Sequence, residues 1–171
     1  EAVAKKARAM ATKVSEAFKH VGLLAVEMFQ TEDDEILVNE VAPRPHNSGH
    51  YSIEASYTNQ FEQQIRAILD LPLGNTDSKV GGIMVNLVGA EGHTGPVVYK
   101  NIENILTMEG ATPHIYGKKE TRPFRKMGHV TICAASIPAL YKKLQPVADL
   151  LIDSNGMPPD ISSNPLVGVI M

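Results

Sequence analysis

The chain has 171 residues, of which 43% are hydrophobic and 20% charged, and its net charge at pH 7 is -3. This composition supports a packed core, excludes a largely disordered chain and argues against a general nucleic-acid binder, so any anion must be recognised by a local cluster of cations. The single cysteine excludes a disulfide framework and suits the reducing cytosol, and no apolar run approaches the roughly 20 residues of a membrane span.

The first 20 residues are predicted to form an amphipathic helix. Apolar residues recur at spacings of three and four, which is the period of one helix face, and the lysines lie mostly elsewhere. The apolar face carries Val3, Ala7, Met10, Val14, Phe18 and Val21. We expect this helix, residues 2–20, to pack on the strands that follow it.

Two apolar strands are predicted to pair next as a β-hairpin. Residues 22–30 form the first strand, and the second begins at Ile36. Each carries one carboxylate, Glu27 in the first strand and Glu40 near the end of the second, and the acidic residues 32–35 form the turn.

The length of that turn decides where the two carboxylates lie. With a four-residue turn, Gln30 faces Leu37, and Glu27 lies opposite Glu40 on the same face of the hairpin. A turn one residue shorter or longer would place Glu27 opposite Asn39 and move Glu40 to the other face. In that case a salt bridge is the simpler explanation of the carboxylates.

Two opposed carboxylates need a reason to lie together. Like charges about 5 Å apart destabilise a sheet, and apolar neighbours add a desolvation cost. The apolar neighbours predicted on that face are Leu23, Ala25, Phe29, Ile36 and Val38. A cation between the carboxylates removes the repulsion, and magnesium typically completes its oxygen shell with phosphates and water. The residues are therefore equally consistent with a magnesium site and with a salt bridge.

A polar loop, residues 43–50, follows the second strand. Its polar side chains include Arg44, His46, Asn47 and Ser48, held between prolines and a glycine. A loop of this kind at the end of a strand is typical of an active-site edge. Helical periodicity resumes over residues 51–69, with a break expected at Thr58 and Asn59.

A smaller, β-rich region is predicted beyond a turn-rich segment near residue 75. The expected elements are a strand over 82–88, a short helix over 101–109, and strands over 114–116 and 129–135. The glycines between residues 89 and 95 lack the spacing and the lysine of a P-loop, so we interpret them as a hairpin connection. Helices combined with hairpins place the chain in the α+β class.

The stretch of residues 117–128 is strongly basic. Its cations are Lys118, Lys119, Arg122, Arg125 and Lys126, against the single acid Glu120. In an acidic chain, such a cluster indicates an anionic ligand, although a solvated hairpin turn has the same composition.

The last predicted helix begins after Ser136, which can cap it, and Pro146 should kink it or split it in two. Its apolar positions are Ile137, Leu140, Leu144, Val147, Ala148 and Leu151. Residues 153–165 have the composition of a linker, and residues 166–171 are typical of the start of a buried strand.

One group of segments carries a family resemblance. Residues 22–29, 37–55, 60–67 and 71–74 resemble the carboxy-terminal half of the 5-(carboxyamino)imidazole ribonucleotide synthetases, ATP-grasp ligases of purine biosynthesis. Many ATP-grasp enzymes have an Asn two residues after the second metal-binding Glu, whereas here Val41 and Ala42 follow Glu40. In lacking this Asn, the sequence resembles this branch of the family. The third metal ligand is therefore unassigned.

This resemblance implies a role for each group of candidate residues. Glu27, Asn39 and Glu40 would contact ATP and its magnesium, with Glu27 and Glu40 as the metal ligands. The catalytic residues, facing carboxyphosphate and the aminoimidazole, would be Arg44, His46, Asn47 and Ser48. The phosphate of the ribonucleotide would be bound by Lys118 or Lys119 together with Arg125, with Arg122 as a further candidate.

The resemblance also implies the reaction. ATP would phosphorylate bicarbonate to carboxyphosphate, and the amine of aminoimidazole ribonucleotide would capture the carboxyl group. We expect ATP and magnesium as cofactors, no nucleic acid, no membrane, a cytoplasmic location and a homo-oligomeric full-length enzyme. The alternatives are another ATP-grasp carboxylase or formate-using ligase, and a noncatalytic phosphate-binding module that would not need both glutamates.

Three regions are expected along the chain. Residues 1–75 would be the carboxy-terminal part of an ATP-grasp domain, and residues 76–152 a small β-rich synthetase domain. Residues 153–171 would be a linker and the first strand of a truncated mutase domain, because residues 166–171 resemble the start of the mutase that fungal and plant enzymes carry behind the synthetase. A fragment without the other half of the ATP cleft is expected to be inactive.

Overall fold

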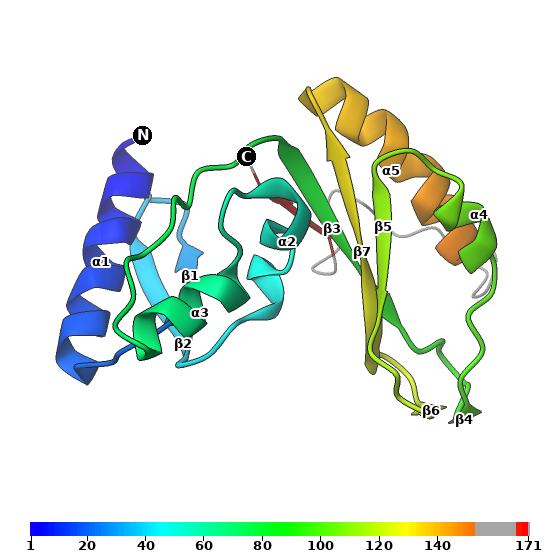
Figure 1. Ribbon diagram of the computed structural model, residues 1–171, viewed down its shortest axis with the longest axis horizontal. Helices are drawn as coiled ribbons and strands as arrows, with labels where there is room; N and C mark the ends of the chain where they lie inside the picture. Colours follow the sequence, from blue (N-terminus) through cyan, green and yellow to red (C-terminus); the bar gives the residue numbers. More distant parts are fainter. Residues whose placement is uncertain (153–166, 171) are drawn as a thin grey trace. The chain divides into compact units, whose positions relative to one another are not determined.

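The computed structural model describes the backbone of residues 1–152 and 167–170 and the side chains of residues 1–147. Contacts divide the chain into two compact units (Figure 1). The first unit comprises Glu1–Gly49 and Tyr57–Thr76, and the second comprises His50–Ser56 and the chain from Asp77 onward. Both units combine helices with antiparallel strands, which confirms the α+β class.

The first unit begins with helix α1 (Ala2–Phe18), as its periodicity predicts. Val3, Ala7, Met10 and Val14 are half-buried along one face, and the helix lies beside the hairpin that follows (Figure 1). The helix ends at Lys19, which adopts a left-handed conformation and donates its N–H to the carbonyl of Glu16. The prediction that Phe18 and Val21 lie on the buried face is wrong, because Phe18 is exposed in the last turn of α1 and Val21 lies beyond the helix.

Strands β1 (Ala25–Gln30) and β2 (Ile36–Ala42) form the predicted hairpin. The turn between them has five residues rather than the four predicted. It is closed by the N–H of Thr31, which donates to the carbonyl of Glu35 at 3.0 Å, and by the N–H of Glu35, which donates to the Thr31 hydroxyl at 3.0 Å.

The longer turn changes the register at the start of the hairpin. Gln30 pairs with Ile36, so the predicted pairing with Leu37 is wrong. A β-bulge directly after Glu27 then shifts the register by one residue, and Glu27 lies opposite Glu40. The predicted opposition of the two carboxylates is therefore confirmed, although the extra turn residue and the bulge replace the regular ladder that we expected.

The hairpin is more exposed than its composition predicts. Phe29 is 59% exposed and Val38 is 41% exposed. A two-stranded sheet buries apolar side chains only where another element covers it, and α1 is the helix that packs on this pair within the described part of the first unit. The expected desolvation of the carboxylates by apolar neighbours is therefore wrong for these residues.

The helical region after the loop is interrupted as predicted. A 3-10 turn (Asn47–Gly49) and the short helix α2 (Ser52–Ala55) precede helix α3 (Gln60–Ile68). Asn59 caps α3, because its side-chain oxygen accepts hydrogen bonds from the N–H groups of Phe61 and Glu62 at 3.0 Å each.

The second unit is built on a four-stranded antiparallel sheet in the order β5-β7-β3-β8 (Figure 1). Its strands are β3 (Gly81–Val88), β5 (Ala111–Ile115), β7 (Lys126–Ala134) and β8 (Val167–Ile170). The remaining elements are α4 (Ile102–Leu106), α5 (Ile137–Ile152) and the small pair β4 (Gly95–Pro96) with β6 (Glu120–Thr121). The short pair joins the glycine loop to the basic stretch.

The two faces of this sheet have different partners. Alternate residues of β3 and β7 face α4 and α5 and form the apolar core, whose main members are Ile83, Val85, Leu87, Ile105, Val130, Ile132, Leu140, Leu144 and Val147. The intervening residues include Asn86, His129 and Thr131, which are also buried, and α2 packs against β3 and β7. One face is therefore apolar and the other is unusually polar for a buried surface.

The last helix is capped as predicted, since the Ser136 hydroxyl accepts from the N–H of Ala139 at 3.4 Å. It is not split, because α5 continues through Pro146 to Ile152. The expected apolar contacts of Ala148 and Leu151 lie outside the described side chains. The strand expected near the end of the chain is present as β8 and pairs with β3, whereas the linker expected over 153–165 lies outside the described residues.

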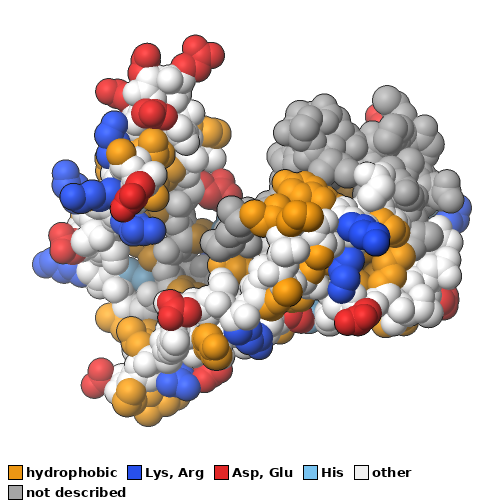
Figure 2. Space-filling view, turned by 90° about the horizontal axis from the view of Figure 1, so that it is seen from above, with side chains coloured by type: hydrophobic (Ala, Val, Ile, Leu, Met, Phe, Trp, Pro, Cys, Tyr) orange, Lys and Arg blue, Asp and Glu red, His pale blue; other side chains and the backbone are white. Residues whose placement is uncertain are grey.

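Hydrophobic side chains also remain on the surface, where Figure 2 shows them interspersed with charged groups. Among the described residues, no helix combines the length and hydropathy needed to cross a bilayer.

Candidate functional site

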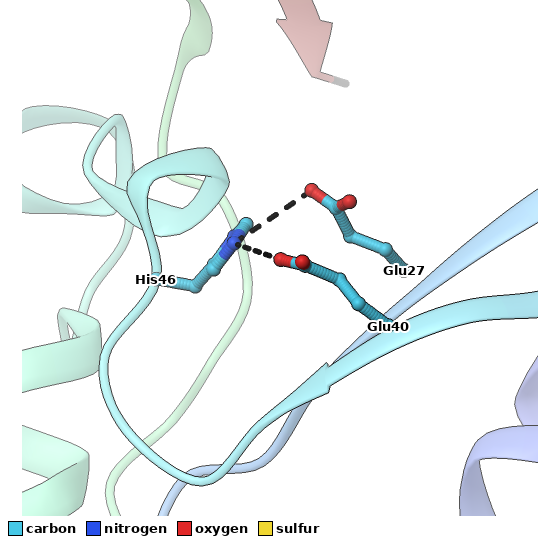
Figure 3. Close-up of side chains that lie close together, drawn as sticks. All are labelled: Glu27, Glu40 and His46. Atoms are coloured by element: carbon cyan, nitrogen blue, oxygen red, sulfur yellow. Dashed lines mark ion pairs between the residues drawn. The ribbon is translucent and has the colours of Figure 1, made fainter. Parts of the chain in front are cut away.

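The strongest candidate site in the first unit is the group of Glu27, Glu40 and His46. The bulge after Glu27 brings the two carboxylates opposite each other, and the loop after β2 turns the His46 imidazole toward both (Figure 3). His46 Nε2 lies 3.7 Å from Glu27 Oε1 and 3.6 Å from Glu40 Oε1. The imidazole is 12% exposed, whereas the carboxylate side chains are 44% and 57% exposed.

Gln60, the first residue of α3, holds the backbone of His46 in place. Its side-chain oxygen accepts from the N–H of His46 at 2.9 Å, and its amide nitrogen donates to the carbonyl of His46 at 2.8 Å. Gly49 closes the same turn by donating its N–H to the carbonyl of His46. A Cβ on Gly49 would lie 2.5 Å from Gln60 Oε1, so a larger residue here would displace the Gln60 side chain from His46.

Two polar neighbours complete the group. Ser48 Oγ lies 2.9 Å from His46 Nδ1, which orients the ring from its far side. Asn39 donates its amide to Glu27 Oε2 at 3.2 Å. The bulge explains this contact, because it places both Asn39 and Glu40 beside Glu27. The alternative register, with Glu27 opposite Asn39 and Glu40 on the other face, is therefore not adopted, although the Asn39 side chain contacts Glu27.

The donor atoms fit a divalent cation. One ligand atom from each of Glu27, Glu40 and His46 can be chosen so that all lie within 4.8 Å of one another. Carboxylate oxygens are the ligands that magnesium prefers, and the partial exposure of both glutamates leaves room for phosphate oxygens and water. The residues therefore fit a magnesium ion held mainly by the two carboxylates.

The remaining predicted loop residues lie in different environments. Arg44 is exposed and donates to the carbonyl of Pro45 at 3.1 Å, so its guanidinium is not directed at the glutamates by any contact found among the described residues. Asn47 is half-buried and Ser48 exposed in the 3-10 turn.

The basic loop belongs to the second unit and connects β5 to β7. Lys118 Nζ donates to the carbonyl of Lys126 and lies 5.6 Å from the centre of the Tyr116 ring. Arg125 donates to the carbonyl of Glu120 at 2.9 Å. Lys119 and Arg122 are exposed. The predicted cations are therefore gathered on one short loop, but two of them also brace its backbone.

The polar face of the second unit contains a group of residues that the sequence did not reveal as a cluster. We call the group formed by His50, Glu54, His114, Tyr116 and His129 the histidine array. His129 stacks between two other imidazoles, with ring centres 4.4 Å from His114 and 4.9 Å from His50. Glu54 Oε1 lies 2.7 Å from His114 Nε2, and the Tyr116 hydroxyl lies 2.9 Å from His129 Nδ1.

Burial gives this array unusual acid–base properties. His129 is only 2% exposed, and burial, followed by the charges of His114 and His50, lowers its pKa to about 4. Burial also raises the pKa of the Tyr116 hydroxyl. His129 is thus neutral at pH 7, and its contact with Tyr116 is a hydrogen bond between neutral groups. The sequence signal for this array was one histidine in each of two strands, His114 in β5 and His129 in β7.

The chain matches two protein-family models. One, described as the ATP-grasp domain, covers residues 1–61, and the other, described as the phosphoribosylaminoimidazole carboxylase C-terminal domain, covers residues 82–143. The chain is also 39% identical over 175 residues to phosphoribosylaminoimidazole carboxylase of Schizosaccharomyces pombe, in an alignment that covers 99% of the chain and 30% of the relative.

Solved structures give the same result. The N5-carboxyaminoimidazole ribonucleotide synthetase of Thermotoga maritima superimposes with a TM-score of 0.80 at 51% identity, over 88% of this chain and 42% of that one. The N5-carboxyaminoimidazole synthase of Aspergillus clavatus, in complex with ADP and 5-aminoimidazole ribonucleotide, superimposes with a TM-score of 0.77 at 37% identity, over 88% of this chain and 40% of that one. The chain spans about a third of the length of the curated relatives it matches.

Proposed function

Because this chain belongs to the N5-carboxyaminoimidazole ribonucleotide synthetase family of ATP-grasp ligases, we propose that it supplies the metal-binding and substrate-binding part of an enzyme that carboxylates 5-aminoimidazole ribonucleotide in purine biosynthesis. In this reaction, bicarbonate attacks the γ-phosphate of ATP to give carboxyphosphate and ADP. The amine of the ribonucleotide then takes up the carboxyl group, and phosphate leaves. The observation that carries the proposal is the convergence of Glu27, Glu40 and His46 at one end of the hairpin.

The two glutamates would hold magnesium, which when bound neutralises phosphate charge during transfer. His46 lies beside both carboxylates, with its ring oriented by Ser48 and its backbone clamped by Gln60. In that position, its imidazole would form a hydrogen bond with the reacting oxygens. Arg44 has a planar guanidinium suited to the carboxylate of carboxyphosphate. Asn47 would provide a further polar contact to the same intermediate.

Glu40→Gln in the full-length protein tests the site. Glutamine keeps the size of the side chain but removes the charge that a cation needs, so ATP turnover in the presence of the ribonucleotide should be abolished while the circular dichroism spectrum is unchanged. Glu35→Gln is the matched control, because Glu35 is an exposed carboxylate in the turn of the same hairpin. Glu40→Gln with activity near that of the wild type would reject the proposal and favour a noncatalytic module.

The basic loop would bind the phosphate of the ribonucleotide. Arg125 and Lys119 are the pair we favour. The Lys118 ammonium both donates to the loop backbone and lies over the Tyr116 ring, whereas Lys119 is exposed, and a guanidinium such as that of Arg125 has further N–H donors besides the one bonded to the Glu120 carbonyl. A phosphate bound equally in the ground and transition states contributes uniform binding, so Arg125→Ala should raise KM for the ribonucleotide about tenfold to a hundredfold with little change in kcat. An unchanged KM in Arg125→Ala, Lys119→Ala and Lys118→Ala would make the loop a solvated turn.

Several finer features belong to the same proposal. Bicarbonate would be the carboxyl source, and the full-length enzyme would be a cytoplasmic homo-oligomer. The chain studied by itself should not hydrolyse ATP in response to the ribonucleotide, because a partial cleft cannot enclose the nucleotide phosphates. A mutase domain would follow the synthetase, as the resemblance of residues 166–171 implies. The domain limits at 75 and 152 remain part of this proposal.

A further inference from the structure

The basic loop is connected to the polar face of the sheet by a continuous series of contacts. Lys118 Nζ donates across the neck of the loop to the carbonyl of Lys126, so the ammonium joins the two strands that enter and leave it. The same ammonium lies 5.6 Å from the centre of the Tyr116 ring, within the range of a cation–π interaction. Tyr116 therefore supports one of the contacts that close the neck, beside the backbone pairing of β5 with β7.

Tyr116 is in turn fixed from the protein interior. Its hydroxyl lies 2.9 Å from Nδ1 of the buried His129, and its backbone N–H donates to the carbonyl of Met127 at 3.0 Å. His129 cannot move easily, because it stacks on His114 and His50. The hydrogen bond between Glu54 and His114 extends the series to α2. The buried His129, held by its stacking partners, thus determines where the Tyr116 ring lies.

We propose that Tyr116, held by His129, is a positioning residue that places Lys118 across the neck of the loop and so sets the geometry in which Lys119 and Arg125 meet the substrate phosphate. This inference rests on the proposed phosphate-binding role of the loop. Tyr116 does not touch the ligand in this arrangement. Tyr116 acts through Lys118, whose ammonium fixes the shape of the loop and does not bind the phosphate.

Substitutions at Tyr116 separate the two ends of its side chain. Tyr116→Phe keeps the ring under Lys118 and loses the hydroxyl, whereas Tyr116→Leu loses both. In the full-length enzyme, we expect Tyr116→Leu to raise KM for the ribonucleotide about fivefold to tenfold, with kcat within about twofold of the wild type, and Tyr116→Phe to have a smaller effect of the same kind. Tyr141→Leu, at an exposed tyrosine of α5, should leave both constants unchanged.

A double-mutant cycle tests whether Tyr116 acts through Lys118. If it does, Tyr116→Leu combined with Lys118→Met should raise KM no more than the larger single effect. The inference would be overturned if the two substitutions raised KM by factors that multiply in the double mutant, or if Tyr116→Leu left KM unchanged. The proposed phosphate site fails separately, since it is rejected only by an unchanged KM in Arg125→Ala, Lys119→Ala and Lys118→Ala.

A second measurement needs no activity. Release of Lys118 should loosen the loop in the present chain, so Tyr116→Leu should be cleaved by trypsin within residues 117–126 at least several times faster than the wild type, while Tyr141→Leu is cleaved at the wild-type rate. Equal cleavage rates for Tyr116→Leu and the wild type would also overturn the inference, because the ring would then not hold the loop.

Discussion

Acidification should destabilise the second unit through His129. The folded protein holds the pKa of this buried histidine at about 4, whereas the unfolded chain has the ordinary value of 6.5. Between pH 6.5 and pH 4, His129 binds a proton in the unfolded chain but not in the folded chain. The free energy of unfolding therefore falls as the pH falls from 6.5 to 4, and His129 causes no further loss below pH 4. At about 1.4 kcal/mol per pKa unit, the unfolding free energy should fall by roughly 3 kcal/mol.

Urea unfolding followed by circular dichroism at several pH values between 7 and 4 measures this loss, and hydrogen exchange of the β7 amides assigns it to the second unit. His129→Phe keeps a ring between His114 and His50 but cannot titrate, so its stability should depend less steeply on pH. His93→Gln, at an exposed histidine, should retain the wild-type dependence. Equal losses of stability in the wild type and in His129→Phe would refute the reasoning, because the proton would then bind elsewhere.

Three further predictions concern packing around the site and core. Asn59→Ala removes the cap of α3 and should lower the unfolding free energy of the first unit by about 1 kcal/mol in urea unfolding. Gly49→Ala should displace Gln60 from the His46 backbone and reduce ATP turnover of the full-length enzyme without unfolding it, as circular dichroism would verify. Ile132→Ala, at a fully buried position, should cost roughly 2–5 kcal/mol, whereas Ile115→Ala at a 44% exposed position should cost clearly less; equal costs would contradict the assigned core.

The sequence alone determined most of the helices and strands. Apolar spacing located α1, and alternation located β3 and β7, because periodicity depends only on local geometry. The opposition of Glu27 and Glu40 was predicted with a four-residue turn, and the structure reaches it with a five-residue turn and a bulge. The motif around Glu40 was long enough to identify the family, which the family models and solved structures confirm.

Only the tertiary structure decided what covers each element and which distant side chains meet. The composition of the hairpin strands indicated burial, yet a strand's own residues do not specify whether another layer lies over them, and Phe29 is exposed. The turn length and the bulge depended on backbone hydrogen bonds that many sequences can form. Glu54 meets His114 across 60 residues of chain, and His129 then fits between two rings from other segments. Such contacts arise from the packing of α2 on the sheet, and no local pattern encodes that packing.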